Sequence, residues 1–302
     1  MKKIITILIV IACFSCKNNQ QDNGKLNVVT TTTMITDLVK NIGGDDINIQ
    51  GLMGSGVDPH LYKASEGDVT KLVEANVIFY NGLHLEGKLV EVFEKMGTAT
   101  KTPIALGEEL DKRTLIGSDY FASNYDPHVW FDIKYFSQFA KKVTQVLSEK
   151  DPEHAVNFKA NETVYLAKLE ALEVKIKAII ETLPQEKRIL VTAHDAFNYF
   201  GKAYDFEVVG LQGLSTATEA GVQDVQKLSA FIIEKNIKAI FVESSVPKRT
   251  IEALQAAVKS KGHDVEIGGT LYSDALGSAG TTEGTYIGMF EYNVKTIVQA
   301  LK

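Results

Sequence analysis

The sequence contains very little cysteine. Among 302 residues only Cys13 and Cys16 carry a thiol, and both lie within the first sixteen positions. A disulfide framework in the folded body is therefore excluded, and so is a metal site built from thiolates. Any metal ion bound by the rest of the chain must be held by histidine and carboxylate side chains.

The chain also lacks an excess of positive charge. Its 32 Lys and Arg residues are outnumbered by 38 Asp and Glu residues, which gives a net charge of −6 and disfavours a nucleic-acid partner. A hydrophobic fraction of 45% with 23% charged residues is ordinary for a globular protein and excludes a disordered chain. At roughly 150 residues per domain, the length corresponds to about two domains.

The N-terminus has the pattern of a secretory signal. Met1-Lys2-Lys3 is basic, and residues 4–12 form a short apolar core. This run is shorter than the about 20 apolar residues that a membrane span requires. We therefore expect an exported protein.

The signal ends in cysteine and resembles a bacterial lipoprotein signal, in which a lipid is attached to the cysteine that becomes the new N-terminus. Cys13 and Cys16 both follow a small residue, but polar sequence begins directly after Cys16. Cys16 is therefore the predicted lipidation site, and Cys13 is the alternative. Residues 1–15 are the predicted signal peptide, and residues 16–24 are a predicted lipid-anchored tether.

Short runs of β-branched residues alternate with longer helical patterns along the chain. Strands are expected at residues 26–31, 47–52, 77–81, 189–192, 206–210, 239–243 and 265–268. Helical segments include residues 34–42, 67–75, 136–148 and 224–235. This alternation predicts an α/β fold with mainly parallel sheets.

One helical segment is longer than the rest. Asp151 is the predicted N-cap, with Pro152 at the first helical position, and neither Gly nor Pro follows until Pro184. Leucine and isoleucine recur at spacings of three and four between residues 169 and 183, as on one face of a helix. A helix of about 45–50 Å exceeds the width of a typical domain.

We therefore predict that the segment 151–184 links two lobes. The first α/β lobe is expected at residues 25–150 and the second at residues 185–302. The alternative is a coiled-coil dimerisation helix, but the heptads are few, and we expect a monomer.

Histidines carry the strongest functional signal. Asp58-Pro59-His60 and Asp126-Pro127-His128 repeat one tripeptide, and His194 comes directly after a predicted strand. Ligands collect at the carboxyl ends of strands in α/β sheets, so these three imidazoles are expected to converge. The fourth ligand of a tetrahedral ion would be a carboxylate, and Asp274 follows the last predicted strand.

Other polar residues are candidates for supporting roles. Glu243 also follows a strand and is the candidate for orienting a ligating imidazole. The aspartates Asp58, Asp126 and Asp195 could do the same or could cap the helices that follow them. His84 is a candidate alternate ligand or a residue behind the ligands. The two remaining histidines, His154 and His263, are expected on the solvated surface.

These motifs resemble the metal-binding lipoproteins of the TroA type, which supply ABC importers of zinc, manganese or iron. The matching segments cover nearly all of the chain after the signal. They include Gly56-Val-Asp-Pro-His60, Tyr80-Asn-Gly-Leu-His-Leu-Glu86, Asp126-Pro-His-Val-Trp-Phe-Asp132, Val191-Thr-Ala-His-Asp-Ala-Phe197, Phe241-Val-Glu-Ser-Ser245 and Ser273-Asp-Ala-Leu-Gly277.

The resemblance implies two α/β lobes joined by one long helix, with a metal ion between them. His60 and His128 would bind it from the first lobe, and His194 and Asp274 from the second. The protein would be a solute-binding lipoprotein in the periplasm or on the outer cell surface. Its partners would be an ABC permease with its ATPase, and the membrane through the lipid.

The sequence falls between the zinc and manganese patterns of these lipoproteins. His194 stands where many manganese or iron members have Glu, but residues 107–125 lack the His-rich loop of zinc-type members. Three histidines with one carboxylate suit Zn²⁺, and the order of metal affinities also favours Zn²⁺ over Mn²⁺.

Two other functions are open at this stage. The first is a surface adhesin or interaction protein, although no residue pattern here encodes a partner surface. The second is a secreted zinc hydrolase, which needs an open metal position and a general base. No His-Glu-x-x-His motif is present, and the fourth ligand position is filled by the protein, so we expect no enzyme activity.

Overall fold

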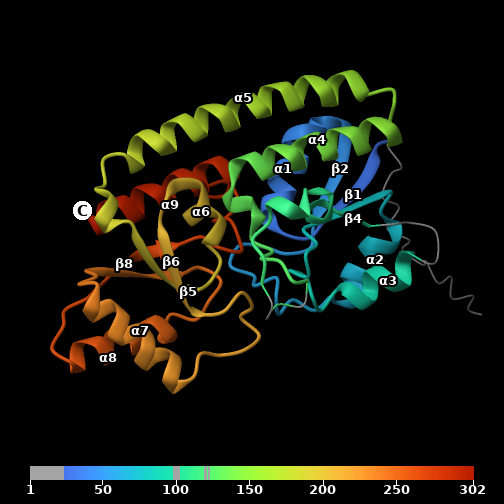
Figure 1. Ribbon diagram of the computed structural model, residues 1–302. Helices are drawn as coiled ribbons and strands as arrows, with labels where there is room; N and C mark the ends of the chain where they lie inside the picture. The colour runs from blue at the N-terminus through green and yellow to red at the C-terminus, as the bar shows by residue number, and fades with distance from the viewer. Residues whose placement is uncertain (1–23, 98–102, 119–120, 122) are drawn as a thin grey trace, which may run out of the picture.

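The computed structural model describes residues 24–97, 103–118, 121 and 123–302. The predicted signal peptide with Cys13 and Cys16 lies outside these residues. The described chain forms two α/β lobes with parallel sheets beneath one long helix, α5 (Ala155–Ile180), which confirms the predicted fold class (Figure 1). Among the residues described, no helix has both the length and the apolar character needed to cross a membrane.

The first lobe contains a four-stranded parallel sheet. Its strand order is β2 (Ile47–Gly51), β1 (Leu26–Thr30), β3 (Val77–Tyr80) and β4 (Ile104–Ala105). Its helices are α1 (Thr33–Gly43), α2 (Glu66–Glu74), α3 (Val90–Gly97) and α4 (Ile133–Lys150). Only two residues join β1 to α1. The second, Thr32, caps the helix, because its hydroxyl accepts the N–H of Ile35.

The second lobe contains two pairs of parallel strands. β5 (Ile189–His194) pairs with β6 (Glu207–Gln212), and β7 (Ala239–Glu243) pairs with β8 (Glu266–Leu271). β5 also contacts β7, so the spatial order is β6, β5, β7, β8. The helices are α6 (Asn198–Tyr204), α7 (Val222–Glu234), α8 (Arg249–Ser260) and α9 (Tyr286–Leu301). α7 and α8 lie on the side of the strands away from α5, and α9 lies between the strands and α5 (Figure 1).

α5 packs against helices of both lobes, as the linking role requires. It contacts α1 and α4 of the first lobe and α9 of the second. The predicted N-cap, however, is wrong. Asp151 is the C-cap of α4, where its N–H donates to the Leu147 carbonyl, and His154 is the N-cap of α5. The chain needs a turn between the two helices, and the Asp151 carboxylate stabilises it through the His154 ring, 2.7 Å away.

One hydrophobic core extends beneath α5 through both lobes. Phe136 of α4 stacks on Tyr286 of α9 with 3.7 Å between ring centroids, and Phe131 lies 4.4 Å from Phe197. A separate core lies between the second lobe's strands and α7 and α8. Because interiors are close-packed, a shared core restricts how far the two lobes can separate.

Candidate metal centre

The four predicted ligands meet between the lobes. His60, His128, His194 and Asp274 are buried, and one potential ligand atom from each lies within 4.8 Å of all the others. His60 Nε2 is 3.2 Å from His128 Nε2, and the Asp274 carboxylate is 3.2 Å from His194 Nε2. Ligands about 2.1 Å from a tetrahedral ion lie roughly 3.4 Å apart, so the cluster has the size of such a site.

Each ligand follows from the local structure of its segment. His194 is the last residue of β5, and Asp274 lies three residues beyond β8. The two Asp-Pro-His tripeptides form matching turns, in which the aspartate Oδ1 accepts the N–H of the histidine at 2.9 Å in both. The ligands therefore come from strand ends and the loops around them, where α/β folds place their sites.

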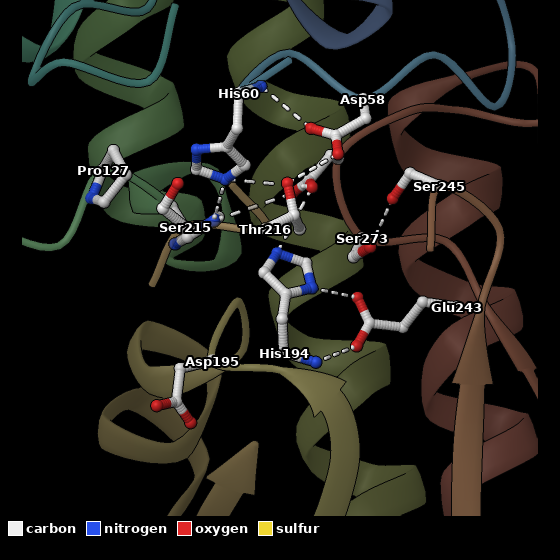
Figure 2. A network of polar contacts seen from close by, with 12 residues as sticks. Asp58, His60, Pro127, His194, Asp195, Ser215, Thr216, Glu243, Ser245 and Ser273 are labelled. Atoms are coloured by element: carbon white, nitrogen blue, oxygen red, sulfur yellow. Dashed lines mark hydrogen bonds and ion pairs between the residues drawn. The ribbon is translucent and has the colours of Figure 1, made fainter. Parts of the chain in front are cut away.

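Two of the imidazoles are backed by buried carboxylates. Glu243 Oε2 is 2.6 Å from His194 Nδ1, and Asp126 Oδ1 is 2.7 Å from His128 Nδ1 (Figure 2 shows the first pair). A carboxylate on Nδ1 holds the proton there and turns the Nε2 lone pair toward the centre. Glu243 and Asp126 therefore both lie where a carboxylate can orient an imidazole, which is the role expected of Glu243. Asp195 instead accepts the N–H of Gly210 on β6.

The centre favours a cation. Burial lowers the pKa of His60 to about 3 against the opposing effect of Asp274, so this imidazole is neutral and free to donate a lone pair. Burial also opposes charge on His194, but Glu243 and Asp274 together raise its pKa well above the usual value. Although burial opposes its ionisation, the neighbouring histidines hold the pKa of Asp274 well below its usual range.

Several polar atoms at the centre have no hydrogen-bond partner among the described residues. Apart from His194 Nδ1 and Glu243 Oε2, which face each other as an ion pair at 2.6 Å, they are His194 Nε2 and both carboxylate oxygens of Asp274. Buried polar atoms in native proteins are nearly always partnered, so unpaired ones require an explanation. A divalent ion would coordinate these atoms together with the two imidazoles opposite, and the donor set therefore fits a metal.

Comparison with known proteins places this site in a family. The model of the periplasmic zinc-uptake complex component A, ZnuA, matches residues 28–300. The chain belongs to the ZnuA family. It is 48% identical to the zinc-binding protein TroA of Treponema pallidum over 288 residues. This alignment covers 95% of this chain and 92% of that protein.

Other members of the ZnuA family differ in the metal they are named for. The manganese-binding lipoprotein MntA of Bacillus subtilis is 48% identical over 278 residues, covering 92% of this chain and 90% of that protein. The solved structure of the periplasmic zinc-binding protein TroA from T. pallidum superposes with a TM-score of 0.89 and covers 92% of this chain and 99% of that one. The TroA structure therefore shares its fold with nearly the whole of this chain.

His84 lies outside the ligand cluster of this ZnuA-family chain. Its side chain is exposed, and its ring stands edge-on to Phe121, with 6.1 Å between centroids. Phe121 in turn stands edge-on to the His60 ring, with 6.4 Å between centroids. His154 and His263 lie partly exposed at the surface, away from the cluster, and contact Asp151 and the Ile237 carbonyl.

Sequence reasoning missed Trp130. Its indole N–H donates to the Ser273 carbonyl at 3.0 Å, beside Asp274, and its ring lies 5.3 Å from that of His128. The residue therefore connects ligand loops from the two lobes. A usable signal was present, because Trp130 is the only tryptophan and follows a ligand by two positions.

Proposed function

We propose that this protein is the extracytoplasmic metal-binding component of an ABC importer. It captures a divalent transition metal ion between its lobes and delivers the ion to a permease driven by an ATPase. The supporting observation is the buried cluster of His60, His128, His194 and Asp274, with ligand atoms within 4.8 Å of one another. A catalytic zinc keeps one position open for water, whereas here protein ligands supply all four, which favours capture over hydrolysis.

Zinc is the favoured cargo and manganese the second candidate. Three imidazoles and one carboxylate are typical zinc ligands, whereas manganese prefers more oxygen. Two relatives of equal identity, at 48%, are named for zinc and for manganese, so both ions belong in the first experiments.

The proposed protein works at a membrane as a monomer, anchored through a lipid on Cys16, with the two lobes at residues 25–150 and 185–302. Relatives named lipoproteins support an anchor of this kind. A Cys16→Ala variant should fail to incorporate labelled palmitate, and continued labelling of that variant would assign the lipid to Cys13.

Metal analysis tests the proposed site. Protein purified without added metal should contain close to one Zn²⁺ or Mn²⁺ per chain, and competition between the two ions should favour Zn²⁺. Asp274→Ala removes the only carboxylate of the cluster and should lose most of the bound metal. Wild-type protein that binds neither ion would contradict the proposal.

A further inference from the structure

The two Asp-Pro-His tripeptides share a second pair of contacts, and these reach the other lobe. Asp58 Oδ2 accepts a hydrogen bond from the Thr216 hydroxyl at 2.6 Å, and Asp126 Oδ2 accepts one from the Asn198 side-chain amide at 3.0 Å. The other oxygen of each aspartate accepts the backbone N–H of its own histidine ligand. Each aspartate therefore joins a first-lobe metal ligand to a second-lobe side chain (Figure 2 labels Asp58, His60 and Thr216).

The second-lobe donors come from segments that supply no predicted ligand. Thr216 lies in the loop between β6 and α7, and Asn198 is the first residue of α6. Neither Thr216 nor Asn198 belongs to the ligand cluster. The two contacts thus form a connection between the lobes that is separate from the ion itself.

The chemistry of these contacts makes them more than incidental. Thr216 and Asp126 are buried and Asp58 and Asn198 are half-buried, so both hydrogen bonds are partly shielded from competing water. Asn198 is linked to the His128 ring through Asp126, because the other oxygen of the same carboxylate lies 2.7 Å from His128 Nδ1. Next to Asn198, Tyr199 of the second lobe also contacts Asp126: its hydroxyl donates to the Asp126 backbone carbonyl at 3.0 Å.

We propose that Thr216 and Asn198 are positioning residues that control how fast the ion is released. Through Asp58 and Asp126 they hold His60 and His128 in ligand geometry while the lobes are together. Separation of the lobes breaks these contacts and loosens both histidine loops at once. Without the contacts, the loops relax while the lobes remain closed, and the ion leaves sooner. This inference rests on the proposed metal-binding function.

Release kinetics test the inference on the full chain. Zn²⁺ is loaded, an excess of chelator is added in a stopped-flow instrument, and the dissociation and association rate constants are measured separately. Thr216→Val and Asn198→Ala should each release Zn²⁺ about tenfold faster, equivalent to about 1.4 kcal/mol, with the association rate constant unchanged. The double variant should be faster than either, and Thr216→Ser, which keeps the hydroxyl, should behave as wild type.

Two controls separate positioning from general damage. Thr250→Val makes the same substitution in the same lobe, where the hydroxyl donates to the nearby Pro247 carbonyl, and it should leave release unchanged. Binding should stay at one ion per chain in every variant, because partial unfolding would lower the stoichiometry instead.

Three results would overturn the inference. Release from Thr216→Val and Asn198→Ala at the rate of Thr250→Val would show that the contacts do not control it. Release from Thr216→Ser as fast as from Thr216→Val would show that the hydroxyl is not the cause. If the wild-type chain binds no Zn²⁺, the proposed function fails and this inference fails with it. The other two results leave the proposed function intact and contradict only this inference.

Discussion

Both carboxylate oxygens of Glu243 contact one residue. Oε1 accepts the backbone N–H of His194 at 2.8 Å, and Oε2 lies 2.6 Å from the ring Nδ1. The backbone and the ring of the ligand are thus fixed by the same side chain. At the scale of single residues, the orientation of His194 depends on this one buried carboxylate.

Glu243→Gln should weaken Zn²⁺ binding by about 10- to 100-fold, because the amide keeps the shape of the side chain but loses the charge that supports Nδ1. Competition titration with a chelator measures the change. Glu219→Gln is the matched control, since the Glu219 side chain is 81% exposed and pairs with Arg249. Equal affinities for the two variants would contradict the assigned role.

Asp68 provides a pH-dependent contribution to stability. Burial opposes its charge, but hydrogen bonds from Ser65, Tyr62 and Lys71 outweigh this and hold its pKa well below the usual range. A carboxyl with a depressed folded-state pKa stabilises the fold above its unfolded pKa, and the contribution is lost as the pH falls toward the folded value.

Asp68→Asn should therefore lower the free energy of unfolding by about 1 kcal/mol at pH 7, in part because Asp68 completes the capping box of α2. Below about pH 4 the unfolded chain takes up a proton at Asp68 that the folded carboxylate does not, so the difference should shrink as the pH falls. Urea unfolding at pH 7 and pH 3 measures both values. A difference that is the same at both pH values would exclude the carboxylate charge as its source.

At the scale of elements, β5 and β6 meet without room for a side chain at Gly210. A Cβ there would lie 2.5 Å from the carbonyl carbon of His194 and from the nitrogen of Asp195. The backbone at the end of β5, which carries a predicted ligand, is thus set by the absence of a side chain on β6.

Gly210→Ala should lower the free energy of unfolding by about 1–3 kcal/mol, because the backbone of β5 must shift to admit the methyl group. Gly213→Ala, three residues further on, would meet no atom within 4 Å and should be close to neutral. Denaturant unfolding of both variants gives the comparison. Equal loss in both would mean that the close approach at Gly210 is not the cause.

The sequence predicts elements well where the pattern is local. The strand 239–243 matches β7 in full, because a parallel strand buried on both faces is a nearly continuous apolar run, here Ala-Ile-Phe-Val. β4 was not predicted, since two residues show no periodicity. The Asp151 prediction failed because an aspartate before proline can end one helix as readily as begin another, and only the packing of α4 and α5 decides between them.

At the scale of the whole molecule, the sequence predicts the four ligands from the repeated Asp-Pro-His tripeptide and from positions after strands, but the strand order that brings them together is visible only in the fold. The roles of the neighbouring carboxylates do not follow in this way. Asp126 and Asp195 both stand close to a histidine in sequence, yet one contacts the His128 ring and the other the backbone of β6. Long-range contacts such as Trp130 to Ser273 depend on how the lobes dock.

A metal ion held by ligands from both lobes should stabilise the whole fold. With free Zn²⁺ at 100 times its dissociation constant, the free energy of unfolding should rise by about 2.7 kcal/mol. Thermal or denaturant unfolding with and without Zn²⁺ measures this rise. Asp274→Ala should show little of it at the same Zn²⁺ concentration, and a rise of equal size in that variant would place the stabilising ion elsewhere.

The loop that carries Asp274 is bonded to both lobes: Ser273 contacts Ser245 and Tyr272 bonds Asn293 in the second lobe, and further bonds come from the first lobe. The Thr33 hydroxyl oxygen accepts the N–H of Leu276, the Ser55 hydroxyl donates to the Leu276 carbonyl, and Trp130 donates to Ser273. A small opening that keeps these first-lobe bonds and breaks the Ser245–Ser273 contact would carry Asp274 away with His60 and His128 and leave only His194 behind. In coordination terms, the site would pass from a tetradentate to a tridentate chelate, and a vacated position on the ion would be open to an incoming ligand while the ion is still held.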